Sequence, residues 1–192
     1  MKIAIGVMGS AGDTTAAVTD KEILARQATA LAKAIAERKL LLLTGVTTGI
    51  VYLVGKTAHD AGAFHVGISP ASDSGEHSGK YGLPQDACDL IVYTGFGLKG
   101  RNVVLVRSCQ IVLFVAGAMG SLNEFTIAHD EGKIIGCLTG TGGVADEADY
   151  LQKKFSKETK ARIFQNNDPG QLLDSCLSEL KAREVSVDEP AS

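Results

Sequence analysis

Apolar and polar positions along the chain follow two alternating patterns. Short runs of mainly apolar residues, such as KIAIGVMG and KLLLLTG, are typical of buried strands. Longer stretches such as DKEILARQATALAKAIAER repeat their apolar positions with the period of a helix. We expect strands at residues 2–9, 39–45, 63–70, 88–95, 110–117, 133–140 and 161–166. We expect helices at residues 20–38, 49–61, 102–107, 122–131 and 144–156, and a last one after Asp168, with Asp20 and Asp168 as N-caps.

Apolar strands separated by helices predict a parallel sheet that is covered on both faces. No repeat or linker divides the chain, so we expect one doubly wound, Rossmann-like α/β domain over residues 1–184 and a disordered tail over residues 185–192. Residues 71–87 are polar and glycine-rich and form the longest expected loop. Ligands of such sheets bind beyond the C-terminal strand ends, where almost all of the glycine-rich segments fall. The function should therefore be sought at this edge.

Composition and charge narrow the class of protein. The 192 residues are 45% apolar and 21% charged, which is typical of a soluble globular domain with a sizeable core. A net charge of −3 gives no sign of a nucleic-acid or anionic-membrane partner. The N-terminal segment lacks the features of a signal peptide, and no apolar stretch approaches the length of a membrane span. We therefore expect a cytoplasmic protein.

Cysteines and histidines give no indication of a metal site. The cysteines form no CxxC pair, and three lie in or beside apolar runs, so we expect reduced core thiols: Cys88, Cys109, Cys137 and Cys176. No histidine pairs with them at the spacing of metal ligands: His59, His65, His77 and His129. We expect His77 to be solvated in the long loop, and Lys56 and Lys99 to be surface lysines that could also contact a phosphate.

The segment AGAMGSLNE at residues 116–124 allows two interpretations. Ser121 and Glu124 have the S-x-x-E spacing of a capping box, which would explain both residues by the start of a helix. Alternatively, the small residues let backbone N–H groups approach a phosphate at the positive end of the helix dipole. The second interpretation assigns to the ligand Gly117, Ala118, Met119, Gly120 and Ser121.

Residues 1–140 resemble the "lysine decarboxylase-like" proteins, known as the LOG family, and their relatives in the SLOG superfamily. Gly117, Gly120, Ser121 and Glu124 match the family motif PGGxGTxxE, with Ser in place of Thr. Further motifs align in order: the TGVTTGI turn resembles TGG-x-x-G, AHDAGAFHVGISP resembles A-x-x-AGG-x-VxGIxP, and the first strand ends in Gly-Ser. The resemblance implies ligand contacts for Gly9, Ser10, Gly45, Thr47, Thr48 and Gly49.

An arginine-containing helix precedes the motif in the family. Its RK pair falls on Arg101 and Asn102, and a second arginine falls on Arg107. Without the resemblance, a solvated loop cation would be the expected role of Arg101, since arginine is mostly exposed. Asn102 stands where the family's pair has lysine, and Ala116 stands where the motif has proline. The two Gly-Gly pairs of the family motifs are replaced by Gly45-Val46 and Gly117-Ala118. The segment GLKGRNVVLVRS is more similar to the branch that contains molybdenum-cofactor carrier proteins than to the cytokinin-activating enzymes.

The resemblance implies two alternative functions. As a hydrolase, the protein would cleave the N-glycosidic bond of a nucleoside 5′-monophosphate, with Glu124 stabilising the developing cation and Arg101 neutralising the phosphate. As a carrier or sensor, it would bind a phosphorylated nucleotide or pterin, such as molybdenum cofactor, without chemistry. The altered glycines and Asn102 favour the carrier. The family also implies a homodimer or higher homo-oligomer in which the partner completes the pocket.

Overall fold

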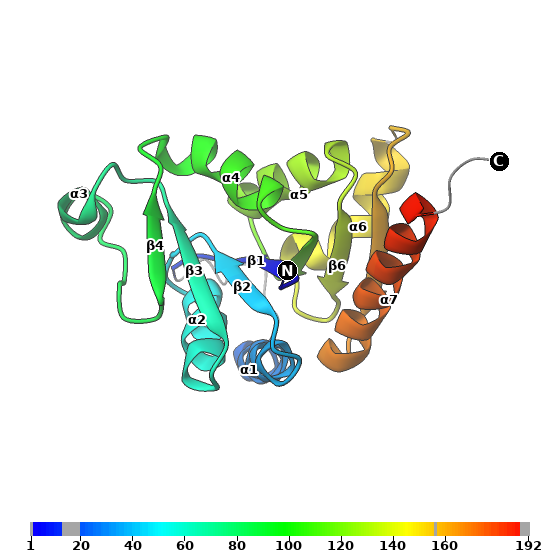
Figure 1. The fold of residues 1–192 in the computed structure, drawn as a ribbon, viewed down its shortest axis with the longest axis horizontal. Coiled ribbons are helices and arrows are strands. Elements are labelled where there is room, and N and C mark those ends of the chain that lie inside the picture. Colours follow the sequence, from blue (N-terminus) through cyan, green and yellow to red (C-terminus); the bar gives the residue numbers. More distant parts are fainter. Residues whose placement is uncertain (1, 13–19, 156, 189–192) are drawn as a thin grey trace.

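The computed structural model describes residues 2–12, 20–155 and 157–188. They form a seven-stranded sheet in the order β4-β3-β2-β1-β5-β6-β7, in which every neighbouring pair is parallel (Figure 1). The strands are β1 (Ala4–Gly9), β2 (Leu41–Thr44), β3 (Phe64–Ser69), β4 (Leu90–Tyr93), β5 (Ile111–Val115), β6 (Ile134–Leu138) and β7 (Arg162–Asn166). The predicted parallel α/β sheet is thus confirmed.

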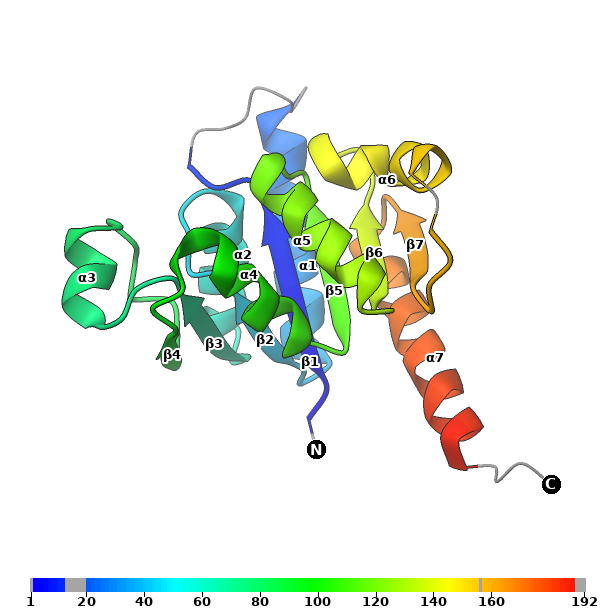
Figure 2. The same ribbon diagram turned by 90° about the horizontal axis from the view of Figure 1, so that it is seen from above.

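Helices cover both faces of the sheet (Figures 1 and 2). One apolar core lies between the sheet and α1, α2 and α7, and the other lies between the sheet and α4, α5 and α6. The helices are α1 (Lys21–Glu37), α2 (Ile50–Asp60), α3 (Ser74–Gly79), α4 (Gly97–Arg107), α5 (Met119–Asp130), α6 (Gly143–Lys154) and α7 (Pro169–Asp188). No described helix is long and apolar enough to cross a membrane. The last residues of the predicted tail, 189–192, lie outside the described residues.

Successive side chains of the strands alternate between the two cores. In β1, for example, Ile5 and Val7 face α1 and α2, whereas Met8 belongs to the cluster on the other face. Three of the four free cysteines are buried, as expected for core thiols, and Cys88 is partly exposed.

The segment 71–87 is not one continuous loop. It contains α3, which Asp73 caps by accepting a hydrogen bond from the Glu76 backbone at 2.8 Å. The expectation that His77 is solvated was wrong, because its ring is buried between β3 and this segment. Its Nδ1 lies 2.8 Å from Ser69 Oγ, and its Nε2 lies 3.1 Å from the Pro84 carbonyl. These two partners, from both sides of the helix, hold the histidine inside.

The order of the strands reverses at β1, which lies between β2 and β5. Ligands of doubly wound sheets bind at such a point, beyond the C-terminal strand ends. Gly9 ends β1 and pairs with Val115 at the end of β5. A Cβ at Gly9 would lie 2.7 Å from the Val115 carbonyl oxygen, so only glycine fits where these strands end. The loops after β1, β2 and β5 therefore meet.

Candidate functional site

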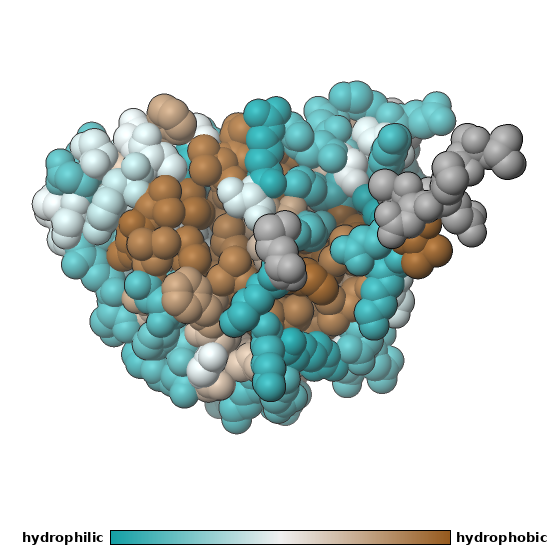
Figure 3. Space-filling model, in the orientation of Figure 1, coloured by the Kyte–Doolittle hydropathy of each residue, from teal (hydrophilic) through white to brown (hydrophobic). Residues whose placement is uncertain are grey.

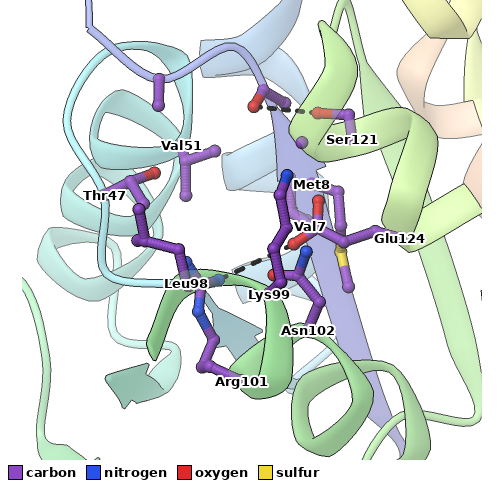
Figure 4. Close-up of a pocket in the computed structure, with 14 residues that line it drawn as sticks. Val7, Met8, Thr47, Val51, Leu98, Lys99, Arg101, Asn102, Ser121 and Glu124 are labelled. Atoms are coloured by element: carbon purple, nitrogen blue, oxygen red, sulfur yellow. Dashed lines mark hydrogen bonds and ion pairs between the residues drawn. The ribbon is translucent and has the colours of Figure 1, made fainter. Parts of the chain in front are cut away.

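A cavity of about 170 Å³ opens at this reversal point, between α4 and α5 (Figure 4). It contains many of the residues that the sequence singled out, and they come from the ends of β1 and β2 and from the two helices. These residues are Gly9, Gly45, Thr47, Arg101, Asn102, Gly120, Ser121 and Glu124. Segments that are far apart in the sequence thus contribute to one site.

Arg101 is the central cation of the cavity. Its side chain is only 5% exposed, because α4 begins at Gly97 and so places Arg101 on the inward face of a helix rather than in a loop. The expectation for Arg101 without the resemblance, a solvated loop cation, was therefore wrong. A Cβ at Gly45 would overlap with the guanidinium group, so the missing side chain there makes room for it. The buried Nε has no hydrogen-bond partner, which leaves a donor for a ligand.

Glu124 faces Arg101 from α5. The shortest distance between them joins Arg101 Nη1 to Glu124 Oε1 and is 3.7 Å, too long for a hydrogen bond. Burial raises the pKa of the Glu124 carboxyl to about 7, although Arg101 and Lys99 act against this shift. Burial also lowers the pKa of Arg101, which remains a cation. The site therefore contains a fixed positive charge next to a carboxyl group that titrates near neutral pH.

The capping box expected between Ser121 and Glu124 does not form. Helix α5 begins at Met119 with Ala118 as N-cap, so Ser121 already lies inside the first turn. The Ser121 hydroxyl donates instead to the Gly9 carbonyl at 3.1 Å, and Glu124 points into the cavity (Figure 4). Neither side chain serves the start of the helix, and this interpretation of the motif was wrong.

Asn102 lies beside the buried pair. With its amide oriented so that both atoms find partners, Nδ2 donates to Glu124 Oε1 at 3.1 Å and to the Leu98 carbonyl at 3.0 Å. The side-chain oxygen then faces the amide of Asn123. Asn102 is thus placed to hold the Glu124 carboxyl group.

The start of α5 is open to the cavity. No side chain caps Ala118, so the N–H groups of the first turn have no side-chain partner. Ala118, Met119 and Gly120 are exposed, and the space beyond Gly120 is empty up to the Lys99 ammonium, 4.0 Å from where a Cβ would lie. Figure 4 shows the Lys99 side chain directed towards this helix start. Backbone donors, the helix dipole and two cations therefore favour an anion here.

Other predicted positions lie outside the cavity lining and connect the loops to one another. Ser10 Oγ accepts from the Gly117 backbone at 3.1 Å, and Thr48 Oγ1 accepts from the Gly12 backbone at 3.0 Å. Gly49 has a φ of +72°, and a Cβ there would lie 2.8 Å from the Ser10 carbonyl oxygen. The three glycine-rich turns thus support each other through backbone contacts.

The sequence does not predict the apolar wall of the cavity, whereas Lys99 is exposed, as expected, and also borders the cavity. The wall consists of core-type residues that nothing in the sequence separates from other core positions: Val7, Met8, Val51 and Leu98. The site thus joins an anion-binding end to an apolar surface, a combination that suits a phosphorylated ligand with a flat, apolar group. Among the described residues, no cluster of three His, Cys, Asp or Glu could hold a metal ion.

Solved structures with the same fold include a cofactor carrier protein and a DNA-processing protein. Protein TM1055 superposes with a TM-score of 0.77 at 22% identity, over 93% of this chain and 99% of that one. A structure of the molybdenum cofactor carrier protein from Chlamydomonas reinhardtii superposes with a TM-score of 0.70 at 25% identity, over 95% of this chain and 99% of that one. DNA processing protein A from Helicobacter pylori, studied for single-stranded DNA binding, superposes with a TM-score of 0.57 at 15% identity, over 94% of this chain and 81% of that one.

Sequence comparison adds a relative and a family. An uncharacterised protein from Archaeoglobus fulgidus is 32% identical over 104 residues, which are 54% of this chain and 63% of the relative. The match therefore spans less than two thirds of that protein. A family model matches residues 2–173, nearly the whole of the described fold, and the chain belongs to the SLOG cluster4 family.

Proposed function

We propose that this protein binds a phosphorylated nucleotide- or pterin-type ligand in the cavity between α4 and α5 and carries or senses it. The observation that carries the proposal is the uncapped start of α5, which faces the buried Arg101 across the cavity. A ligand phosphate would accept from the first-turn N–H groups of α5, while Arg101 and Lys99 balance its charge. The apolar wall would cover the base or pterin.

Molybdenum cofactor is the specific cargo that we propose. The similarity to the carrier protein from Chlamydomonas reinhardtii supports a carried ligand of this kind. The chemistry of the cavity fits as well, because a pterin phosphate needs an anion site at one end and an apolar contact along its ring. The absence of a nucleic-acid partner and a cytoplasmic location stay predictions.

The arrangement of Glu124 favours a second candidate, the phosphoribohydrolase of the LOG enzymes. A buried carboxyl group with a pKa of about 7, held by Asn102 beside an arginine, is suited to stabilise a cation at the anomeric carbon or to orient water. The same group next to a phosphate weakens binding when it is ionised, because like charges repel. Turnover therefore separates the candidates, and affinity alone does not.

The test combines binding with product analysis. The purified protein is titrated in a calorimeter with nucleoside 5′-monophosphates and, anaerobically, with released molybdenum cofactor, while ribose 5-phosphate is assayed. We expect binding without release of ribose 5-phosphate, and equal or tighter binding in Glu124→Gln. Release by the wild type that Glu124→Gln abolishes would instead make the protein a hydrolase.

Two glycines provide a matched pair of variants for the site. Gly120→Val fills the space at the start of α5 and should abolish binding with little loss of stability, because outside the adjoining backbone of α5 the nearest atom to the new Cβ is the Lys99 ammonium at 4.0 Å. Gly79→Val places the same side chain on α3, also in open space and remote from the cavity, and should bind like the wild type. Unchanged affinity in Gly120→Val would remove this helix start from the site.

Self-association is also part of the proposal. An apolar patch lies over β3 and β4 in Figure 3, and it contains the exposed side chains of Phe64, Leu90 and Val92. Leu98, which is half-exposed, belongs to the cavity wall, so a second copy of the chain near α4 would approach the ligand. Sedimentation velocity should give a dimer or larger species, and a monomer at high concentration would contradict it.

A further inference from the structure

A buried histidine is linked to the loop that follows β2. His65 Nδ1 lies in hydrogen-bonding contact with the Ala87 carbonyl, which can only accept, so Nδ1 carries the proton. Nε2 must then accept, and the Thr44 hydroxyl donates to it at 2.8 Å. Having donated its hydrogen, Thr44 Oγ1 accepts from the Val46 backbone N–H at 3.2 Å. Burial lowers the pKa of His65, which agrees with the neutral tautomer.

Glycines on both sides make room for this chain of hydrogen bonds. A Cβ at Gly55 on α2 would lie 2.5 Å from His65 Cε1, and a Cβ at Gly67 on β3 would overlap with the Val46 side chain. Val46 is buried and has a φ of +48°, a left-handed conformation that is costly for a β-branched residue. The surrounding contacts must therefore hold Val46 in place.

The conformation of Val46 matters for the cavity because its neighbour is Gly45. The guanidinium group of Arg101 occupies the space that a side chain at Gly45 would fill. A change of the backbone at Val46 would carry Gly45 with it and alter the support of the buried cation. The hydrogen bond from Val46 to Thr44 is thus one residue away from the surface on which Arg101 packs.

We propose that His65 is a positioning residue for the cavity. It orients the Thr44 hydroxyl, which fixes the backbone of Val46, and the adjacent Gly45 then sets the place of the Arg101 guanidinium. His65 does not line the cavity, and it acts on a ligand through these residues alone. The effect on binding rests on the proposed function, whereas the effect on Arg101 does not.

The end of β3 offers a natural control. There the His77 ring donates from Nε2 to the Pro84 carbonyl, accepts at Nδ1 from Ser69 Oγ, and Ser69 Oγ accepts from the Ala71 backbone at 3.1 Å. As at β2, a buried hydroxyl connects a buried histidine ring to a backbone N–H group. None of the residues in this second arrangement lines the cavity. A merely structural role would make the two arrangements equivalent.

The test compares Thr44→Val, which keeps the size of the side chain, with Thr44→Ser and with Ser69→Ala. Guanosine 5′-monophosphate serves as the probe in calorimetry, and thermal unfolding reports stability. We expect Thr44→Val to weaken binding about fivefold to tenfold, the equivalent of one hydrogen bond. Thr44→Ser should restore the affinity, and Ser69→Ala should lose stability without losing affinity. Equal losses of affinity in Thr44→Val and Ser69→Ala would overturn the inference.

A second readout needs no ligand. In ¹⁵N NMR spectra, the Arg101 Nε–H resonance should shift in Thr44→Val and remain in place in Ser69→Ala, because only the first variant releases the Gly45 loop. An unshifted resonance in Thr44→Val overturns the inference whether or not the probe binds. A shifted resonance in a protein that binds no probe upholds the role of the hydrogen-bonded chain from His65 through Thr44 to Val46 and contradicts the proposed function instead.

Discussion

The helices of the described fold begin in two different ways. An aspartate caps α1, α3 and α7, each by accepting from backbone N–H groups of its first turn: Asp20, Asp73 and Asp168. None of these helices lines the cavity. The three helices that do line it, α2, α4 and α5, have no side-chain cap; their N-cap residues are Gly49, Phe96 and Ala118.

A fourth helix without a side-chain cap, α6, differs from the three that line the cavity. Helix α6 has Gly142 as its N-cap residue, without a side-chain cap, and lies away from the cavity. Its Asp146 nevertheless accepts from the Gly140 and Gly142 backbones at 2.7 and 2.9 Å, so a carboxylate occupies the positive end of this helix too. Among the helices that the structure describes, only those that start around the cavity lack a carboxylate partner at the start. A protein carboxylate thus lies at the helix starts away from the cavity, and the starts around the cavity have none.

The largest expected effect concerns the cation that faces the uncapped start of α5. Arg101→Ala should cost about 1.5–3 kcal/mol of ligand affinity, the range for charge-assisted hydrogen bonds. Arg107→Ala, on the same helix, removes an exposed arginine that pairs with Glu131 at 2.6 Å and should leave the affinity unchanged. Calorimetry with guanosine 5′-monophosphate measures both. A loss below about twofold in Arg101→Ala would place the anion elsewhere.

The next effect is the pH dependence of stability that Glu124 produces. The pKa of Glu124 is about 7 in the folded protein and 4.5 in an unperturbed side chain, so the folded state binds the additional proton. The contribution of Glu124 to the free energy of unfolding is complete below pH 4.5 and is lost as the pH rises through about 7. Glu124→Gln should remove the loss, on the order of 2 kcal/mol, and so flatten this part of the unfolding profile.

Glu131 provides the control for this pH profile. It directly follows α5 and is exposed, and its hydrogen-bonded ion pair with Arg107 lowers the pKa of its carboxyl group. Its contribution is therefore present above the unfolded pKa of 4.5 and is lost only as the pH falls through the lower folded value. Glu131→Gln should leave the slope between pH 4.5 and 7 in place. The same slope in the wild type and in Glu124→Gln would mean that the Glu124 carboxyl is ionised throughout this range.

The smallest effect exchanges the two kinds of helix start. Ala118→Asp gives α5 a cap, which its extended backbone at φ −113° can accommodate, and should stabilise the fold by about 1 kcal/mol while weakening anion binding. Asp168→Ala removes the cap of α7 and should destabilise the fold by about 1 kcal/mol without affecting binding. Thermal unfolding and calorimetry measure both quantities. Tighter binding in Ala118→Asp would contradict an anion at this helix start.

Local patterns in the sequence determined most of the fold. Apolar runs marked the strands, and their alternation with helices predicted the parallel sheet, because burial on both faces imposes that pattern. Asp168 was identified as a cap from its position alone, since a cap and its helix are adjacent in the chain. The glycine-rich turns indicated the edge of the sheet at which the cavity opens, because the backbone conformations that require glycine are local.

Tertiary contacts decided the roles of individual side chains at the site. Ser121 and Glu124 have the spacing of a capping box, but the Gly9 carbonyl, distant in sequence, binds the hydroxyl, and the carboxyl group turns towards Arg101. His77 became a core residue in the same way, through partners on β3 and beyond α3. A spacing pattern specifies what a side chain can reach within its own helix. Which partner it takes depends on the strands and helices packed around it, and only the folded chain brings those together.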